Sequence, residues 1–345
     1  MKKLLTTTAL AAVFISGSAI AQTTITGDVR IGYKAIETSA GSNHGANRGF
    51  GQETQINIQT KGKLNNGLDF AMGMSLEGDA NNAPASDENT YVDFISGNTT
   101  ISISRDHIQR SDSDRSAAQL VGYAASEIPA GFMPAATSDS SNLFQGNIGA
   151  APGQAWGIAA LQKTDLGTFS INYVPVNAAP GNSESYANTA HTAGKAAYEV
   201  GFVGNIGVKG LNVSAFKNSE EQLAGKTAKR EATNYGANYN FGAVTVGANK
   251  KDHKGSGSLS TTAEITEKQY AIAYALTPTL TLGARLDKAD GGGTTAQAEI
   301  KSVQLGYNLG AISVIAGVAE VENILGSTAT NQDGKVGFVQ LRGAF

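Results

Sequence analysis

The sequence predicts an all-β protein: a transmembrane antiparallel β-barrel of about 16 strands, with a long third loop that folds inward. Three observations lead to this fold class. The chain opens with an export signal, its later segments alternate apolar with polar residues, and its connections alternate between tight turns and long polar loops. Strands that alternate in this way have one apolar and one polar face, as the wall of a membrane barrel requires.

The first 21 residues are predicted to be a secretory signal peptide. Lys2 and Lys3 provide its positive start, residues 9–15 its apolar middle, and Ala19-Ile20-Ala21 a small-x-small cleavage site. An N-terminal membrane anchor is the alternative, but the apolar run is shorter than the roughly 20 residues that a spanning helix needs. We therefore expect export, with residues 1–21 removed and residues 22–345 forming one barrel domain.

The composition excludes several classes of protein. The chain has no cysteine, a net charge of −3 and only 16% charged residues, whereas an ordinary soluble protein has about 25%. It lacks the concentrated basic surface of a nucleic-acid-binding protein, so we expect no nucleic-acid partner. After residue 22 there is no run of about 18 apolar residues, so no transmembrane helix is predicted.

The strands are predicted from alternation along the mature chain. In the first strand, Ile25, Val29 and Ile31 share one face, while Asp28 and Arg30 share the other. The same pattern recurs at residues 68–77, 101–104, 234–241, 280–287 and 302–309. A soluble all-β protein also has strands with one apolar face, but a protein of this size needs some strands that are apolar on both faces to build a core. Few such strands are found, which favours the membrane barrel.

Tight turns and longer polar loops alternate between these strands. The predicted turns are at residues 65–67, 96–98, 165–167, 207–210, 241–242, 277–279 and 309–310, and the longer loops are at 36–51, 79–88, 177–194, 218–232, 252–266, 290–298 and 323–334. We count roughly 16 strands, or about 20 residues for each strand and its connection, which suits membrane strands of about 10 residues. An even number also brings both chain ends to the same side of the barrel.

One predicted loop, residues 107–153, is much longer than the others. Loops of this length are usually functional or disordered. This one carries apolar residues that need a packing partner: Leu120, Val121, Tyr123, Ile128, Phe132, Met133, Leu143 and Phe144. Outside the cell they would form an exposed apolar patch. We therefore expect the loop to fold into the barrel and to narrow its lumen.

The last predicted strand, residues 335–345, ends the chain on an aromatic residue. Val339, Leu341 and Phe345 share its apolar face, and Gln340 and Arg342 share the other. We expect Phe345 to lie in the aromatic girdle at the membrane surface.

Four segments carry a family resemblance: ITGDVRIGYKA at 25–35, LNNGLDFAMGMSLEGDA at 64–80, NTYVDFISGNTTISISRD at 89–106 and VGFVQLRGAF at 336–345. They resemble the general porins of alphaproteobacteria, a family of Gram-negative outer-membrane proteins. The resemblance implies an outer-membrane location and a water-filled channel for passive diffusion of ions and small hydrophilic solutes, narrowed by the third loop. It also implies a homotrimer among the outer-membrane lipids, and recognition of Phe345 by the barrel assembly machinery.

Charged residues on the predicted inner faces are candidates for setting ion preference. The wall cations are Arg30, Lys34, Lys61, Arg285 and Arg342, and the carboxylates on or at the base of the long loop are Asp106, Asp112, Asp114 and Glu127. Opposed across a narrow passage, they would produce a transverse field, because fixed charges act strongly at short range. The alternative is that each is an ordinary solvated charge.

No catalytic or cofactor motif is present, so we expect a channel without a cofactor and not an enzyme. The aspartates of residues 111–119 could bind a hard cation, although their spacing matches no metal-binding loop. The four histidines, at positions 44, 107, 191 and 253, fall in predicted loops. A solute-specific outer-membrane channel and an outer-membrane barrel enzyme remain the alternatives to a general diffusion channel.

Overall fold

The computed structural model describes residues 22–38, 48–79, 86–105, 116–122, 125, 127–128, 143–144, 156–175, 196–220, 231–254, 264–291, 294–326 and 333–345. Within these residues the chain forms sixteen strands. No helix among them is long and apolar enough to cross a membrane.

In the part of the chain that the structure describes, the strands follow one another with no other regular element between them. The first eight are β1 (Gln22–Thr38), β2 (Arg48–Lys63), β3 (Asp69–Asp79), β4 (Ser86–Ser96), β5 (Thr99–Arg105), β6 (Trp156–Thr164), β7 (Gly167–Val174) and β8 (Ala197–Gly204). The second eight are β9 (Leu211–Glu220), β10 (Glu231–Asn240), β11 (Val244–Lys254), β12 (Ile265–Thr277), β13 (Leu280–Gly291), β14 (Ala298–Asn308), β15 (Ile312–Glu322) and β16 (Gly334–Ala344).

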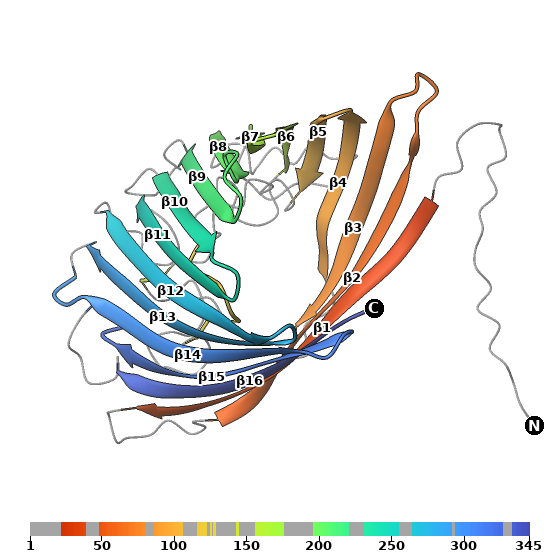
Figure 1. The fold of residues 1–345 in the computed structure, drawn as a ribbon. Coiled ribbons are helices and arrows are strands. Elements are labelled where there is room, and N and C mark those ends of the chain that lie inside the picture. Colours follow the sequence, from red (N-terminus) through yellow and green to blue (C-terminus); the bar gives the residue numbers. More distant parts are fainter. Residues whose placement is uncertain are drawn as a thin grey trace, which may run out of the picture.

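The sheet is a closed antiparallel barrel (Figure 1). Each strand pairs with its neighbours in sequence, and β1 pairs with β16, with Arg30 opposite Arg342 and Ile36 opposite Val336. This confirms the predicted fold class and the count of sixteen. Closure pairs the backbone groups of the strands that an open sheet would leave at its edges, which is the condition for a sheet to span a membrane.

Tight turns join the strands at one rim of the barrel, and longer connections join them at the other. The turn between β4 and β5 needs only residues 97 and 98. Gly97 there has φ of 56° and Gly67, in the turn between β2 and β3, has φ of 84°, a region that residues with a Cβ adopt rarely. These two turns were predicted from Asn-Gly and Gly-Asn pairs.

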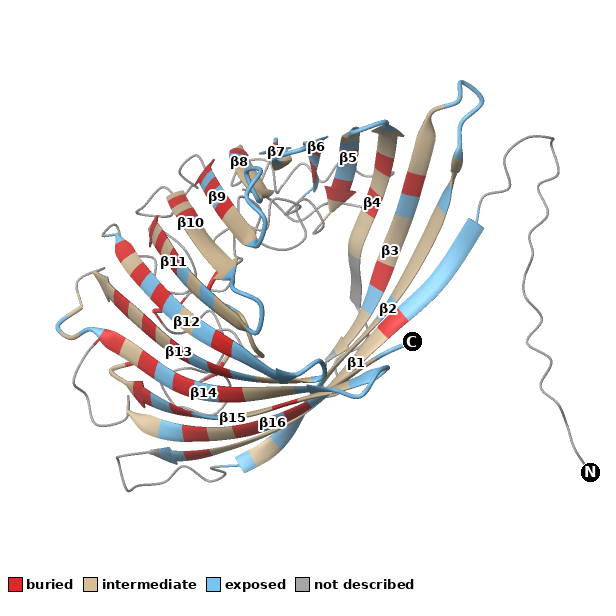
Figure 2. Ribbon diagram, viewed as in Figure 1, coloured by how far each residue is buried: buried red, intermediate tan, exposed pale blue. Residues whose placement is uncertain are grey.

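The two faces of the wall are inverted relative to a soluble protein. Outward side chains such as Ile25 (65% exposed) and Val318 (64% exposed) are apolar, whereas inward side chains such as Glu199 and Gln269 are polar and buried. Figure 2 shows the resulting alternation of buried and exposed residues along the strands. Apolar side chains on the outside face lipid at no cost, so this arrangement indicates a membrane barrel and not a soluble one.

The strands on one side of the barrel are much longer than on the other. β1 and β2 have 17 and 16 residues, whereas β5 has 7 and β7 and β8 have 8 each. At about 3.3 Å per residue the wall therefore has an uneven height.

Several strands extend beyond the boundaries expected from the sequence. The expected loop at 252–266 is wrong at its start, because β11 continues to Lys254 and carries His253 in a strand. The outward residues there are charged and pair across and along the strands: Lys254 lies 2.7 Å from Glu231, and Lys250 lies 2.6 Å from Asp252. The strand therefore continues beyond the apolar band of the barrel. Both of its faces are polar or charged there, so the contrast between polar and apolar residues by which a strand is recognised in the sequence is absent.

Phe345 closes the seam between the first and last strands. Its amide donates to the Gly27 carbonyl (3.0 Å), and the Gly27 amide donates to the Phe345 carbonyl (2.8 Å). The Phe345 ring lies over Gly27, where a Cβ would come within 2.3 Å of the ring and 2.8 Å of the Gln55 carbonyl oxygen. A residue without a side chain is therefore required at position 27 for the terminal ring to occupy this place.

We predict that Gly27→Ala lowers the temperature at which the folded barrel unfolds on a gel, because overpacking of this kind costs typically about 1–3 kcal/mol. The matched control is Gly337→Ala, on the same seam and the same outer face, where a Cβ meets nothing within 4 Å. Equal unfolding temperatures for the two variants would show that the ring does not depend on Gly27.

Candidate functional site: the barrel lumen

The inner wall carries the five cations that the sequence placed there. In an antiparallel pair, residues opposite each other point to the same face. Lys34 is opposite Phe338, Arg30 is opposite Arg342, Lys61 is opposite Ala71, and Arg285 is opposite Ser302. Phe338, Ala71 and Ser302 are buried inside the barrel, so all five cations belong to the inner face.

The long connection between β5 and β6 enters the lumen and hydrogen-bonds to the wall. The Ala117 amide donates to Asn249 Oδ1 (3.2 Å), and Asn238 Nδ2 donates to the Ala117 carbonyl (3.3 Å). Ala117 and Ala118 are both buried. The described parts of the loop therefore confirm that it folds inward.

Inward glycines on the wall make room for this loop. A Cβ on Gly236 would lie 2.9 Å from the Ala117 Cβ, a Cβ on Gly247 would lie 2.4 Å from the Ala117 carbonyl oxygen, and a Cβ on Gly283 would lie 2.8 Å from Val121 Cγ2. Contacts under 3.0 Å cannot form without movement of the loop or the wall. These glycines, on β10, β11 and β13, form a seat for residues 116–122, and the sequence signal for it was glycine at inward positions of neighbouring strands.

Farther along, the loop is fixed by an apolar cluster. Ile128, Leu143 and Phe144 are fully buried and pack with wall residues that include Ile300 and Phe338. The Leu143 amide also donates to the Ile324 carbonyl (3.2 Å) in the connection between β15 and β16. The apolar side chains of the loop thus have the inner wall as their packing partner, as expected. Tyr123, Phe132 and Met133 lie outside the described residues.

Lys34 and Glu127 join the loop to the wall of β1. Lys34 Nζ donates to the backbone carbonyl of Glu127 (2.5 Å), and its charge also interacts with that of the Glu127 side chain. Of the four predicted loop carboxylates, Glu127 is the one within the described residues. Asp106, Asp112 and Asp114 lie outside them.

Two other predicted cations are held by wall residues. Arg30 lies between two carboxylates, with Nε 3.2 Å from Asp28 Oδ2 and Nη1 2.8 Å from Glu53 Oε1. Arg342 donates through Nε to Gln340 on its own strand. Lys61 lies near the tight-turn rim and is exposed.

Arg285 lies in a different environment, within a buried ionic cluster on β11, β12 and β13. Its Nε is 2.7 Å from Asp287 Oδ1, and the two side chains are 4% and 0% exposed. Next to them, His253 Nε2 lies 3.0 Å from Glu267 Oε1, with both side chains again buried. Lys251 is the fifth buried member.

Sequence reasoning missed most of this cluster. Lys251 and His253 share the inward parity of Asn249 on β11, and Glu267 shares that of Gln269 on β12. The alternation was therefore present, but the expected loop at 252–266 removed His253 from the inner wall. Glu199, on β8, was by contrast expected on the inner wall; it is fully buried there, and its Oε1 accepts a hydrogen bond from Asn172 Nδ2 (3.2 Å).

Comparisons with known proteins agree with this architecture. The sequence profile described as Gram-negative porin matches residues 6–324. No curated protein matches the chain. Among solved structures, the anion-selective porin of Comamonas acidovorans superposes with a TM-score of 0.63 at 13% identity, covering 94% of this chain and 100% of that chain. A variant of the Rhodopseudomonas blastica porin superposes with a TM-score of 0.61 at 14% identity, with the same coverage.

At these identities the solved structures show a shared fold, while the profile match extends over most of the sequence. A closed sixteen-stranded barrel, an apolar outer face, a polar inner face and an inward-folded loop after β5 fit that match. The chain therefore belongs to the Gram-negative porin family.

Proposed function

We propose that this protein is a general diffusion channel of the outer membrane, which passes ions and small hydrophilic solutes through a water-filled lumen. One observation carries the proposal: a closed barrel has a polar inner wall, and the described segments of the long loop are anchored to that wall inside the lumen. Such a lumen offers hydrated solutes a continuous polar path across the apolar core of the membrane.

A solute-specific channel is less well supported. Sugar-selective transport would need a ladder of aromatic side chains along the lumen. On the described strands the inward aromatics are Tyr91, Phe216 and Phe338, which lie on β4, β9 and β16 and are buried. They are too far apart around the barrel to form a continuous track.

An enzymatic function is also less well supported. The described histidine with a carboxylate partner is His253, and its pair with Glu267 is buried in the wall. A solute in the lumen has no access to that imidazole, so the pair is better explained as part of the wall than as a catalytic base.

We propose that the constriction lies where the loop approaches β16 and β1. Lys34 and Glu127 define the contact, and Arg30 and Arg342 line the lumen beside it. Lys61 would act nearer the tight-turn rim, while Arg285 is covered by the loop. Asp106, Asp112 and Asp114 remain proposed loop carboxylates of the same constriction. Charges at such short range from a passing ion are expected to set its preference.

Three further features complete the proposal. Residues 1–21, which lie outside the described residues, would direct export and be removed. Phe345 would be read by the barrel assembly machinery. Three barrels would associate in the membrane.

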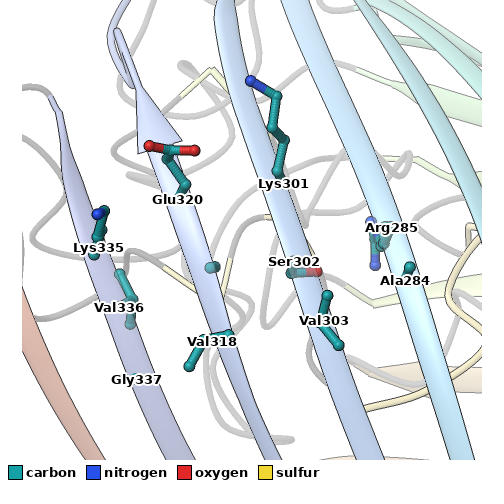
Figure 3. Close-up of a pocket in the computed structure, with 11 residues that line it drawn as sticks. Ala284, Arg285, Lys301, Ser302, Val303, Val318, Glu320, Lys335, Val336 and Gly337 are labelled. Carbon is teal, nitrogen blue, oxygen red and sulfur yellow. The ribbon is translucent and has the colours of Figure 1, made fainter.

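A surface on the described strands that suits this association is a groove of about 520 Å³ on the outer face of β13–β16. Ala284, Val303, Val318 and Gly337 give it a shallow apolar lining, and Lys301, Glu320 and Lys335 lie toward one end (Figure 3). Small side chains allow another protein surface to approach closely. The alternating charges at the end of the groove would fix the orientation of a second copy.

We expect deletion of residues 117–138 to raise single-channel conductance in a planar bilayer and to admit larger sugars, because the part of the loop that is seated on β10, β11 and β13 is removed. A point variant tests the contact between the loop and the inward glycines while the loop itself remains in place. Gly247→Val should displace residues 116–122 from the wall and change the single-channel conductance or the noise of the single-channel current. Gly51→Val adds the same bulk to the inner wall of β2, where a Cβ meets nothing within 4 Å.

If the deletion leaves both conductance and exclusion limit unchanged, the loop does not control the pore. If Gly51→Val has the same effect as Gly247→Val, the glycine seat has no special role.

Deletion of Phe345 is expected to reduce the amount of membrane-inserted protein more than the stability of what is inserted. Burial of an aromatic side chain contributes only about 1.5–3 kcal/mol, and the barrel has many others. The measurement compares the yield in outer-membrane fractions with the heat resistance of the folded band. A normal yield would exclude a role in assembly.

We expect Val318→Trp to reduce the native mass from that of three chains to that of one chain. The larger side chain fills the groove, so a second copy can no longer pack there. Val200→Trp is the control, because Val200 is also outward and exposed, on β8. Tryptophan is tolerated at lipid-facing positions near the interface, so both variants should insert. Native mass in mild detergent decides, and a trimer in both variants would place the interface elsewhere.

A further inference from the structure

We infer that the outer face of β11, β12 and β13 binds the phosphate group of a membrane lipid, at a row formed by Lys250, Lys268 and Lys288. These three strands are neighbours in the barrel (Figure 1). The site lies on the lipid-facing side of the wall and not in the lumen, so the inference goes beyond the proposed channel and does not depend on conduction. We call Lys250, Lys268 and Lys288 the lysine row.

The register of the sheet places the three lysines side by side. Lys250 is opposite Lys268, and Lys268 is opposite Lys288. The adjacent residues on β11 and β12, Lys251 and Glu267, are buried on the inner face, so the lysine row points outward. Directly opposite side chains have Cβ atoms about 4.5–5.5 Å apart, and like charges in such positions destabilise a sheet. The lysine row therefore needs negative charge close to it.

The two outer members of the lysine row each have a carboxylate of the wall. Lys250 Nζ lies 2.6 Å from Asp252 Oδ2, and Lys288 Nζ lies 2.7 Å from Glu299 Oε2. Lys268, between them, has no carboxylate within ion-pair distance in the part of the chain that the structure describes. Lys268 is also exposed, so its ammonium group is accessible to a ligand.

Two further carboxylate oxygens on this outer face are engaged by other side chains. Asp290 Oδ2 accepts a hydrogen bond from Gln297 Nε2 (3.0 Å). The second oxygen of Glu299 pairs with Lys301 on the same strand. The described part of the wall therefore leaves the charge of Lys268 without compensation, between two other cations.

An apolar surface begins directly next to the lysine row, on the side toward the tight turns. The next outward residues of β11, β12 and β13 are Ala248, Tyr270 and Leu286, followed by Val246, Ile272 and Ala284. Tyr270 and Ile272 are each 49% exposed, and tyrosine is enriched where a membrane protein meets the lipid headgroups. The lysine row thus lies at the border of the apolar band, on the side of the long connections, which is the extracellular side of such barrels.

This arrangement fits a ligand with a compact anionic head and an apolar body. A phosphate monoester carries a charge of about −1.5 to −2 at neutral pH and three acceptor oxygens, so one such group can accept hydrogen bonds from Lys268 and a neighbouring lysine. The acyl chains of the same lipid would lie on the apolar residues beside the row. A free anion would leave that apolar surface unused, and we therefore assign the lysine row to a lipid phosphate monoester.

Lipid binding by the purified full-length protein in detergent tests the site. The probe is phosphatidic acid, which carries a phosphate monoester, and the control lipid is phosphatidylcholine with the same acyl chains. Native mass spectrometry gives the fraction of protein that carries each lipid. We expect Lys268→Gln to weaken binding of phosphatidic acid about fivefold, the contribution of one lysine near an anionic lipid surface. Binding of phosphatidylcholine should not change.

The matched control is Lys217→Gln. Lys217 is also an exposed lysine on the outer face, on β9, but it lies opposite Thr233 and Val200 and not opposite another cation. The substitution removes the same charge from the same face of the barrel. This variant should bind phosphatidic acid as the wild-type protein does.

A charge reversal gives a second readout that a merely disruptive substitution would not produce. Lys268→Glu places a carboxylate between Lys250 and Lys288, so attraction replaces repulsion across both strand pairs. In detergent without lipid this variant should unfold at a higher temperature than the wild-type protein. Phosphatidic acid should then raise the unfolding temperature of the wild-type protein and not that of Lys268→Glu.

Equal binding of phosphatidic acid by the wild-type protein and Lys268→Gln, or an equal loss in Lys217→Gln, would overturn the inference. If inorganic phosphate raises the unfolding temperature as far as phosphatidic acid does, the ligand is a free anion and not a lipid. A native mass that falls from three chains to one in Lys268→Gln, with lipid binding unchanged, would assign the lysine row to contact between chains. A protein that binds phosphatidic acid as expected but conducts no ions in a planar bilayer would refute the proposed channel and not this site.

Discussion

The structure depends on the pairing of β1 with β16. Backbone groups in the apolar core of a membrane have no water to bond, so a sheet can span it only when it has no free edge. The seam meets this condition from Asp28–Ala344 to Thr38–Gly334, and the two hydrogen bonds between Gly27 and Phe345 extend it to the last residue of the chain. All other features follow from a closed wall with one face toward lipid and one toward water.

A closed wall of sixteen strands encloses a lumen that must be both water-filled and narrow. The protein narrows it with a chain segment and not with large side chains. Glycines at inward positions of β10, β11 and β13 let the loop backbone approach the sheet, and Ile128, Leu143 and Phe144 attach it by burial of apolar surface. The same lumen wall is therefore a packing surface on one side and a polar, solvent-accessible surface on the other. The same alternation of residues produces the packing surface and the solvent-accessible surface. The position of the loop, and not the strand itself, decides which inward residues are exposed to water.

Because the loop covers part of the wall, an inward position on a strand does not by itself tell whether a charge is exposed to the lumen. Arg30 and Arg285 are indistinguishable by strand parity, yet Arg30 remains partly exposed between Asp28 and Glu53 while Arg285 is buried against Asp287. Paired charges also extend above the apolar band on the outer face, as in Lys254 with Glu231.

The sequence by itself determined the class of fold, the approximate number of strands, the inner and outer faces of the strands in which alternation was read, and the inward course of the long loop. Each of these is local or nearly so: alternation has a period of two residues, turns have characteristic residues, and an apolar loop needs a packing partner. Only the tertiary structure decided which inward charges the loop covers, that His253 lies in a strand beside Glu267, and that Gly27 makes room for Phe345. These features depend on contacts between segments that lie 14 to more than 300 residues apart in the sequence. The periodicity of a single strand carries no information about which residues lie opposite that strand across the lumen.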